Sequence, residues 1–165
     1  MSYVVGGSTV VTRAEWGARA PRQITSLRAP RSTAHWEGPG MGIHDHAVCY
    51  SLVRGIQNFH MDGRGWSDIA YNAVVCPHGV IFEGRWVGRK SGANGTNAGN
   101  AGAYAVCYLG GVGDPFTNDA KRAMRDALLF LAPGDPNGHR DWKPTQCPGD
   151  DIYSWLYSGM PVDGA

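Results

Sequence analysis

The sequence from residue 138 to residue 152 reads Gly-His-Arg-Asp-Trp-Lys-Pro-Thr-Gln-Cys-Pro-Gly-Asp-Asp-Ile. His139 and Cys147 stand eight residues apart in this stretch. Pro144 and Pro148 each remove a backbone donor and bias the preceding residue toward an extended conformation, so the segment cannot form a regular helix. We expect a stiff loop that holds both side chains in place. Since imidazole and thiolate are common zinc ligands, this loop predicts two of the ligands of a metal site.

A third ligand is expected from His35, far upstream in the sequence. The segment 32–36 is compatible with a short β-strand, and the glycines and proline that follow it end the strand at once. Taken alone, His35 is more often an ordinary half-buried histidine than a ligand. Together with His139 and Cys147 it would leave the fourth tetrahedral position open for water, which is typical of a hydrolytic rather than a structural zinc site.

The bulk composition excludes several classes of protein. The chain has 165 residues and a formal net charge of +1, so it can bury a core of its own but carries no large basic field. The sequence also has no basic run interleaved with aromatic residues, so nucleic-acid binding has little support. The start, Met1–Gly7, lacks the basic head and apolar run of a secretory signal, and no apolar stretch approaches the roughly 20 residues of a membrane span. We expect a soluble protein made in the cytosol.

The remaining cysteines and histidines receive plainer interpretations. The chain has no C-x-x-C pair, so neither a zinc knuckle nor a redox dithiol is indicated. Three cysteines in apolar surroundings are expected to be buried free thiols rather than partners in a disulfide: Cys49, Cys76 and Cys107. His44 and His46 could chelate a metal from one face of a strand, but their place before a helix favours a solvated turn. His60 is expected at a helix end and His78 in a turn.

Hydrophobic periodicity predicts the main elements. Apolar residues at three- and four-residue steps predict amphipathic helices over 45–59 and from Thr117 to Leu131. Segments 68–76 and 80–85 are expected to form a β-hairpin, and 105–109 another buried strand. The pattern of helices with few strands predicts an α/β or α+β fold, with one mixed sheet and helices on its faces.

Three further segments are short. The residues before Gly6 are expected to be a short tail, and an ordered segment is expected to begin at a capping box between Thr12 and Glu15. The run 91–102, almost wholly Gly, Ala, Asn, Ser and Thr, is expected to be a surface loop, and the rim of a binding groove is the sharper alternative. Asp150 is expected to cap a last short helix.

Four stretches together carry a resemblance to a known family. They are Thr12–Arg19; Ile56–His60 with Gly65–Asn72; Gly79–Arg85; and Gly138–Asp141 continuing through Thr145 to Gly149. These stretches resemble the zinc N-acetylmuramoyl-L-alanine amidases of the type 2 amidase superfamily, which includes phage lysozymes of the amidase type and peptidoglycan recognition proteins. The resemblance covers about residues 10–157, and we take 1–165 as a single catalytic amidase domain.

The resemblance implies a fold and a site. The fold would be α/β, a central mixed β-sheet flanked by helices as in the peptidoglycan recognition proteins. His35, His139 and Cys147 match the family's ligands for zinc, and Tyr71 and Thr145 match its two polar active-site positions. Without the resemblance, Tyr71 would be interpreted as a core tyrosine with a satisfied hydroxyl.

Two positions depart from the phage-type pattern. Thr145 stands where those enzymes usually have lysine, and it agrees instead with the recognition proteins. This leaves less positive charge to stabilise an oxyanion. Trp36 and Glu37 replace the more usual small or polar residues after His35, so an aromatic ring would shape the floor of the substrate site.

The expected activity is zinc-dependent hydrolysis of the amide bond between N-acetylmuramic acid and L-alanine in bacterial peptidoglycan. We expect the protein to be a monomeric phage endolysin. It would be made in the host cytoplasm without a signal peptide and would act on the cell wall after release. One alternative is a non-catalytic peptidoglycan-binding module, against which Cys147 argues because binding-only relatives typically lose that thiolate. The other is a recycling amidase that acts on soluble muropeptides, whose relatives usually carry aspartate as the third ligand.

Overall fold

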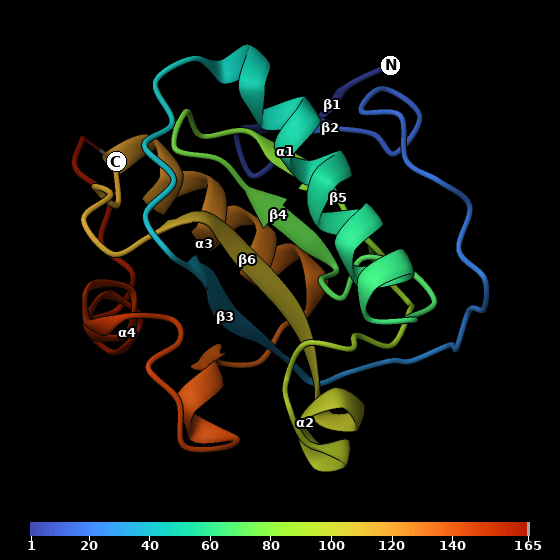
Figure 1. Ribbon diagram of the computed structural model, residues 1–165. Coiled ribbons are helices and arrows are strands. Elements are labelled where there is room, and N and C mark those ends of the chain that lie inside the picture. Colours follow the sequence, from blue (N-terminus) through green and yellow to red (C-terminus); the bar gives the residue numbers. More distant parts are fainter. Residues whose placement is uncertain (165) are drawn as a thin grey trace.

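The computed structural model describes residues 1–164, which form one seven-stranded mixed β-sheet with helices on both faces (Figure 1). The strand order is β1-β2-β5-β4-β6-β3-β7. The strands are β1 (Tyr3–Val5), β2 (Ser8–Val11), β3 (Arg31–Gly38), β4 (Ala73–Val75), β5 (Ile81–Glu83), β6 (Ala103–Gly111) and β7 (Asn137–Gly138). The helices are α1 (His46–Asn58), α2 (Asn97–Gly102), α3 (Asn118–Leu131) and α4 (Asp150–Tyr157). The α/β class and the mixed sheet predicted from the sequence are confirmed.

The central strand β6 explains the order of the sheet. All nine of its residues are buried, and it pairs in parallel with β4 on one side and with β3 on the other. A strand that is buried on both faces must be apolar along its whole length, which fits its sequence Ala-Tyr-Ala-Val-Cys-Tyr-Leu-Gly-Gly. The antiparallel pairs lie on the β1 side of β6, where β4 pairs with β5 and β1 pairs with β2.

Helices divide the core into two layers. In Figure 1, α1 crosses in front of the sheet and α3 lies behind it. The front layer packs Trp16, Cys49 and Val53 against side chains such as Phe82 and Leu109. The back layer places the apolar face of α3 against the other side of the sheet, through Ala120, Ala123, Met124, Ala127, Leu128 and Leu131. The apolar periodicity of α3 therefore marks the face that the helix buries. In α1 it does not, because Val48 and Phe59 are exposed and the buried residues are Cys49, Val53 and Gln57.

Side-chain caps begin the two long helices. The Asp45 carboxylate accepts a hydrogen bond from the backbone N–H of Ala47 at 2.9 Å, and the Thr117 hydroxyl accepts one from Ala120 at 3.0 Å. Asp150 is the first residue of α4 rather than its cap, which is Gly149. The Thr12–Glu15 capping box is present as reciprocal hydrogen bonds, in a segment of turns.

Several predicted boundaries are wrong. The N-terminal segment is not a tail, because β1 and β2 pair with each other and extend the sheet through β5. The strand predicted over 68–76 is confined to Ala73–Val75, since the preceding backbone turns away to bond with the segment after β5. The run 91–102 is not simply a loop, because Thr96 caps the short helix α2 within it. The two-residue strand β7 gives no sequence signal of its own.

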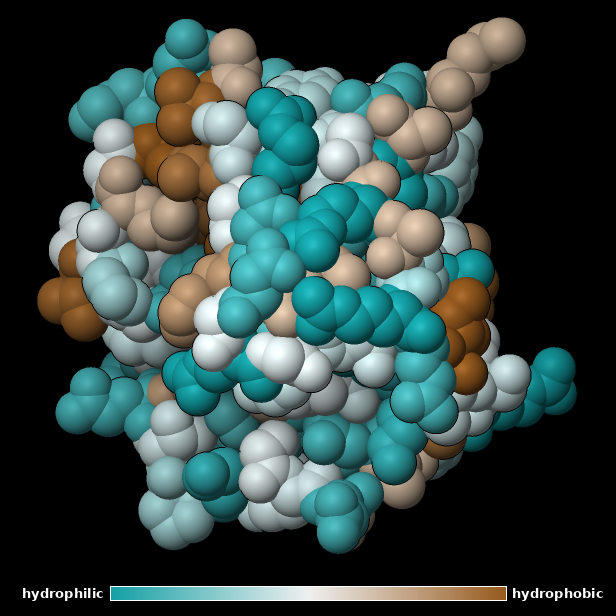
Figure 2. All heavy atoms as spheres, turned by 45° about the vertical axis from the view of Figure 1, so that its right-hand side comes forward, coloured by the Kyte–Doolittle hydropathy of each residue, from teal (hydrophilic) through white to brown (hydrophobic). Residues whose placement is uncertain are grey.

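The surface is largely polar on the face shown in Figure 2, where hydrophobic atoms gather in small separate patches. Among residues 1–164, no helix combines the length and the apolar character needed to cross a membrane.

Candidate metal centre

The pairing of β3 with β7 brings the first two predicted ligands together. Thr33 and Ala34 of β3 stand opposite Asn137 and Gly138 of β7 in a parallel register. His35 follows Ala34 and His139 follows Gly138, so the two histidines lie side by side at the end of this pairing. Their ring centroids lie 4.5 Å apart. His139 then begins a single 3₁₀ turn, His139–Asp141, which leads the chain into the proline-marked loop.

Cys147 closes the group from that loop. Its Sγ atom lies 3.6 Å from Nδ1 of His35 and accepts a hydrogen bond from the backbone N–H of Trp36 at 3.4 Å. The ligand atoms of His35, His139 and Cys147 all lie within 4.8 Å of one another. The structure thus brings together the three side chains predicted from the sequence as ligands.

Asn94 orients the first histidine. Its side-chain amide N–H groups donate to the carbonyl oxygens of Gly99 at 2.9 Å and of Ala103 at 3.0 Å. The amide oxygen therefore faces Nε2 of His35, at 2.7 Å, and must accept a hydrogen bond from it. With its hydrogen on Nε2, His35 presents the lone pair of Nδ1 toward Cys147. A partner that fixes the tautomer in this way is a regular companion of metal-binding histidine.

His139 fits a metal ligand for a different reason. Both of its ring nitrogens are buried, and neither has a hydrogen-bond partner within the described chain. A buried polar atom without a partner is costly, and a metal ion would satisfy one of the two. Burial, and then the positive charge of Lys143, lowers the pKa of His139, which keeps the imidazole neutral as a ligand must be.

Burial also governs the ionisation of the other two groups. It lowers the pKa of His35 to about 3 and raises the pKa of the Cys147 thiol to about 11. In both cases the protein interior disfavours the charged form. A bound dication reverses this preference at the sulfur, because thiolate and not thiol is the metal ligand. Two imidazoles and one thiolate form a donor set suited to zinc.

Tyr71 lies in the irregular segment before β4 rather than within a strand, which corrects the predicted strand boundary. Its ring centroid is 5.7 Å from that of His35. Tyr71 is half-buried and lines the groove. Loss of hydration, followed by the nearby Cys107 and Glu37, holds the pKa of Tyr71 well above its ordinary value. The phenol therefore stays protonated and can donate a hydrogen bond at any pH near neutrality.

Thr145 is placed on the same groove, beside Cys147. Its hydroxyl accepts a hydrogen bond from the backbone N–H of Cys147 at 3.2 Å, so the threonine braces the loop that carries the thiol. Both of the predicted polar positions, Tyr71 and Thr145, line the groove that contains the three ligands.

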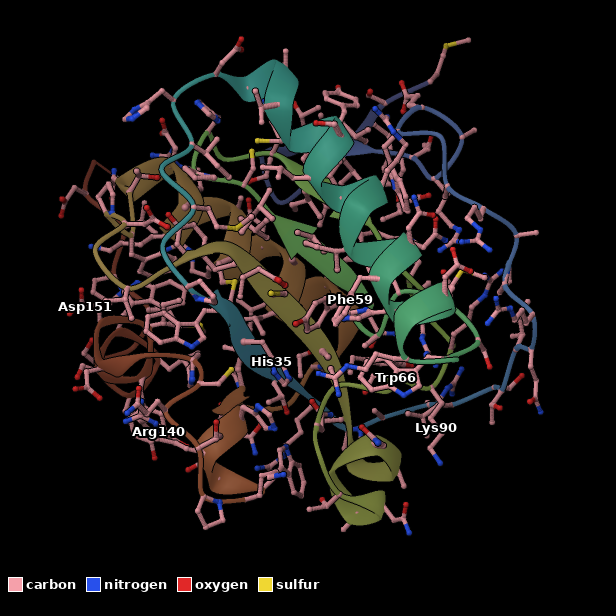
Figure 3. The ribbon with its side chains drawn as sticks, in the orientation of Figure 1. His35, Phe59, Trp66, Lys90, Arg140 and Asp151 are labelled. Carbon is pink, nitrogen blue, oxygen red and sulfur yellow. The ribbon has the colours of Figure 1, made fainter. Side chains whose placement is uncertain are left out.

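The groove has a volume of about 580 Å³. The end of α1 and the π-helical turn after it, Phe59–Gly63, form one wall, and Gly92, Ala93 and Gly95 form part of the rim. Figure 3 shows His35 with Phe59 and Trp66 on one side and Arg140 on the other. The guanidinium of Arg64 lies over both the Phe59 and the Trp66 rings, at 5.4 and 5.6 Å from their centroids. Aromatic faces beside a cation suit a ligand with both apolar and acidic parts.

Two residues of the site were not identified by the sequence patterns. Asn94 lies in the low-complexity run, where one asparagine among several gives no signal, although the rim position of that run was the sharper alternative. Glu37 stands out in the sequence only as part of an unusual Trp-Glu pair, and its carboxylate accepts a hydrogen bond from the Cys107 thiol at 3.3 Å. Burial raises the pKa of Glu37.

The other histidines lie apart from this centre. His60 is buried in the groove wall, where its Nδ1 accepts a hydrogen bond from the backbone N–H of Ala70 at 3.0 Å. His44 is exposed, and only its carbonyl oxygen contacts another histidine, His78. His46 and His78 lie instead near Cys49 and Cys76. The burial predicted for Cys49, Cys76 and Cys107 is confirmed.

Comparison with known proteins gives relatives over nearly the whole chain. A peptidoglycan-recognition protein SC2 of Drosophila simulans is 32% identical over 164 residues, which cover 93% of this chain and 87% of that protein. An N-acetylmuramoyl-L-alanine amidase of Sus scrofa is 32% identical over 92% of this chain, but the match spans only 27% of that protein. No family model matches the chain.

Solved structures share the fold. The peptidoglycan recognition protein LE, solved with tracheal cytotoxin, a monomeric diaminopimelic acid-type peptidoglycan, superposes with a TM-score of 0.80 at 25% identity. The match covers 90% of this chain and 92% of that one. Human PGRP-IBETAC in complex with glycosamyl muramyl pentapeptide gives a TM-score of 0.78 at 24% identity, covering 90% and 94% of the two chains.

Proposed function

Because the chain belongs to the peptidoglycan recognition protein family, we propose that its groove binds peptidoglycan and that its metal centre hydrolyses the bond between N-acetylmuramic acid and L-alanine. The observation that carries this proposal is the group of His35, His139 and Cys147 at the floor of the groove, with both ring nitrogens of His139 buried and unpaired. A protein that only held its ligand would have no use for this costly arrangement.

Each residue has a role that follows from its surroundings. His35, His139 and Cys147 would hold the metal, and Asn94 keeps the His35 ring in the tautomer that leaves Nδ1 free. Zinc bound there would polarise the scissile carbonyl and lower the pKa of a water molecule. Tyr71, kept protonated by its burial, would donate a hydrogen bond to the carbonyl oxygen as negative charge develops on it. Thr145 positions the Cys147 loop.

The aromatic wall would position the substrate. Phe59 and Trp66 offer apolar faces to sugar rings or to the aliphatic parts of a stem peptide, and Arg64 between them offers a cation to a peptide carboxylate. These contacts lie away from the metal and would supply binding energy that orients the amide bond.

A binding-only function is the second candidate, favoured by the names of several relatives, which are recognition proteins, and by the complex of a structural relative with a monomeric peptidoglycan. The groove could perform that function without any metal. Retention of Cys147 with two neighbouring histidines supports hydrolysis over binding alone. We also propose lysis of a bacterial host by an endolysin as the context, because the superfamily that the chain resembles includes phage lysozymes of the amidase type; Thr145 departs from the pattern of those enzymes.

The test is mass spectrometry of purified cell wall after incubation with the zinc-loaded protein. An amidase releases stem peptides with free L-alanine amino termini and creates no new reducing sugar ends. His139→Ala should abolish this release while wall binding in a pull-down persists. The matched control is His44→Ala, which removes an exposed histidine outside the groove and should leave the rate unchanged.

Each result separates the candidates. Wall binding without any cleavage by the zinc-loaded wild-type protein would identify a recognition module. New reducing ends would indicate a glycosidase, and cleavage that survives in His139→Ala would remove the metal centre from the reaction.

A further inference from the structure

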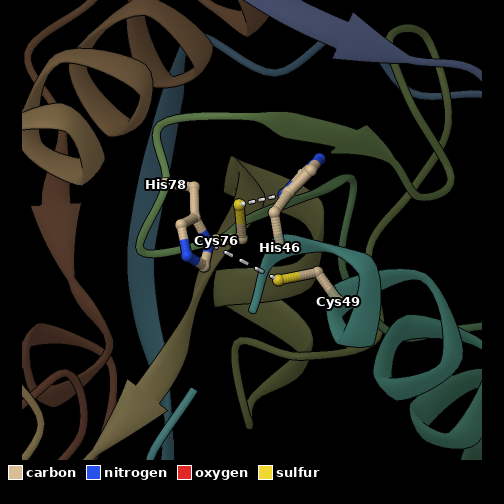
Figure 4. A group of neighbouring side chains, drawn as sticks. All are labelled: His46, Cys49, Cys76 and His78. Carbon is tan, nitrogen blue, oxygen red and sulfur yellow. Dashed lines mark hydrogen bonds between the residues drawn. The ribbon is translucent and has the colours of Figure 1, made fainter. Parts of the chain in front are cut away.

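A second group of metal-binding side chains lies outside the groove, where α1 begins (Figure 4). His46 and Cys49 belong to the first turn of α1, and their three-residue spacing places them on one side of the helix. Cys76 and His78 come from the turn that joins β4 to β5. Figure 4 shows the four side chains converging from these two separate elements.

The distances match a tetrahedral site. Sγ of Cys76 lies 3.6 Å from Nδ1 of His46, and Sγ of Cys49 lies 4.0 Å from Nδ1 of His78. One ligand atom from each of the four residues can be chosen so that all lie within 4.8 Å of one another. Sulfur at 2.3 Å and nitrogen near 2.0 Å from a tetrahedral zinc ion would be separated by about 3.5 Å. The side chains are therefore spaced almost as a bound ion requires.

The protein also fixes the orientation of one ring. Nε2 of His78 lies 3.2 Å from the carbonyl oxygen of His44, which can only accept a hydrogen bond. The ring hydrogen therefore resides on Nε2, and Nδ1 is left with its lone pair directed toward Cys49. A backbone carbonyl that holds the second nitrogen is a usual companion of metal-binding histidine.

The two sulfurs of this group are buried, whereas His46 is half-buried and His78 is exposed. The protein therefore shields the thiols while the imidazoles reach the surface, where an ion can enter. Cys107 provides an internal contrast, since its thiol is also buried but donates a hydrogen bond to the Glu37 carboxylate at 3.3 Å.

We propose that His46, Cys49, Cys76 and His78 bind a second zinc ion, in a structural site. Four protein ligands of this kind complete the tetrahedron and leave no position for substrate. The site lies at the start of α1, and the groove wall begins at the other end of that helix, about 18 Å away along its axis. Bound zinc would join α1 to the β4–β5 hairpin, whose strands run beneath it.

The inference does not depend on the proposed amidase activity, and metal analysis can separate the two sites. The wild-type protein, Cys49→Ser, Cys147→Ser and the double variant are dialysed against buffered zinc, and zinc per chain is measured by inductively coupled plasma mass spectrometry. We expect two zinc ions in the wild type, one in each single variant and none in the double variant. His44→Asn is the matched control and should hold two, because His44 contributes only its carbonyl oxygen.

Two outcomes would overturn the proposal. One is a Cys49→Ser protein with the same zinc content as the wild type. The other is an intact mass of the wild-type protein that reveals a Cys49–Cys76 disulfide in place of two thiols. A Cys147→Ser protein that still holds two ions would contradict the metal centre in the groove and leave the second site supported.

A second variant guards against misfolding, since Cys49 is fully buried. His78 is exposed, so His78→Asn should preserve the fold while removing one ligand. In the Cys147→Ser background, we expect this change to weaken zinc binding at least tenfold in competition with a chromogenic chelator. Addition of zinc should also raise the melting temperature of Cys147→Ser but not of the Cys147→Ser/His78→Asn protein. An unchanged zinc affinity in the second protein would rule the site out.

Discussion

At the scale of single residues, Asn94 illustrates how a side chain that touches no metal can control the centre. Its side-chain amide donates both hydrogens to backbone carbonyl oxygens, so only the amide oxygen faces His35. Asn94→Ala would release the His35 ring and its tautomer. We expect zinc affinity to fall by about 10- to 100-fold, the usual loss for such partners. Competition titration with a zinc-selective dye measures this directly.

The control for Asn94 is Asn97→Ala, an exposed position in α2. It should bind zinc as the wild type does. Circular dichroism must show that both variants retain the fold, and an undiminished affinity in a folded Asn94→Ala protein would refute the role of the amide.

Tyr71 allows chemistry to be separated from metal binding. Tyr71→Phe removes one hydroxyl beside the centre and none of the three ligands, so zinc content and binding of wall fragments should be unchanged. Loss of a hydrogen-bond donor that acts on developing charge costs roughly 10²- to 10³-fold in turnover. Zinc content, fragment affinity and amide cleavage should be measured on one preparation. A Tyr71→Phe protein with full turnover would show that Tyr71 has only a structural role.

The site residues differ in how far the sequence could identify them. Their resemblance to a family motif singled out His35, His139 and Cys147, although the register that joins them arises from β7, which is too short to carry a pattern. Asn94 could not be found, because its role depends on two carbonyl oxygens supplied by α2 and the start of β6. The grouping of His46 with Cys76 was missed for a related reason. Their contact depends on how α1 packs against the β4–β5 hairpin.

At the scale of elements, Thr117 links the start of α3 to the β4–β5 turn. Its hydroxyl accepts from the N–H of Ala120 and donates to the carbonyl oxygen of Pro77 at 2.5 Å. Thr117→Ala should lower the free energy of unfolding by about 1–2 kcal/mol through loss of the cap. Thr117→Ser keeps the hydroxyl and should cost much less. Urea denaturation of the three proteins compares them, and equal stability of Ala and Ser variants would exclude the hydroxyl as the cause.

The elements themselves were predictable in proportion to their length. The helices α1 and α3 have enough turns for an apolar stripe to stand out, and β6 is apolar throughout. The strands β1 and β2 were missed because they are too short for an alternating pattern to stand out, and β1 is largely exposed at the edge of the sheet. The helix α2 was missed because its glycines and asparagines favour other structures, and the Thr96 cap and tertiary packing override that preference.

At the scale of the whole molecule, buried histidines make stability depend on pH. Burial, reinforced by Arg64 and Arg85, lowers the pKa of His60 from 6.5 to about 4. The unfolded chain therefore binds a proton at His60 at a higher pH than the folded chain does. The stability that His60 contributes is complete above pH 6.5 and is lost as the pH falls toward 4, by at most about 3 kcal/mol.

The corresponding experiment is denaturation of chelator-treated protein between pH 7 and pH 4.5. His60→Asn keeps an acceptor for the Ala70 N–H but cannot be protonated in this range. Its stability should decline less steeply than that of the wild type, with the residual decline due to the other buried histidines, such as His35. Parallel curves for the two proteins would show that His60 is not responsible.

The parallel pairing of β3 with β7 also affects when the metal centre forms during folding. His35 and Cys147 are separated by 112 residues, and the strand that aligns His139 is laid down near the end of the chain at the far edge of the sheet. Contacts between such distant segments form only after long stretches of chain have been ordered, so they tend to be slow to appear. The ability to capture zinc at this centre should therefore be among the last properties to emerge as the protein refolds, after most helical signal has returned. A newly synthesised chain would acquire it only after Cys147 has been made.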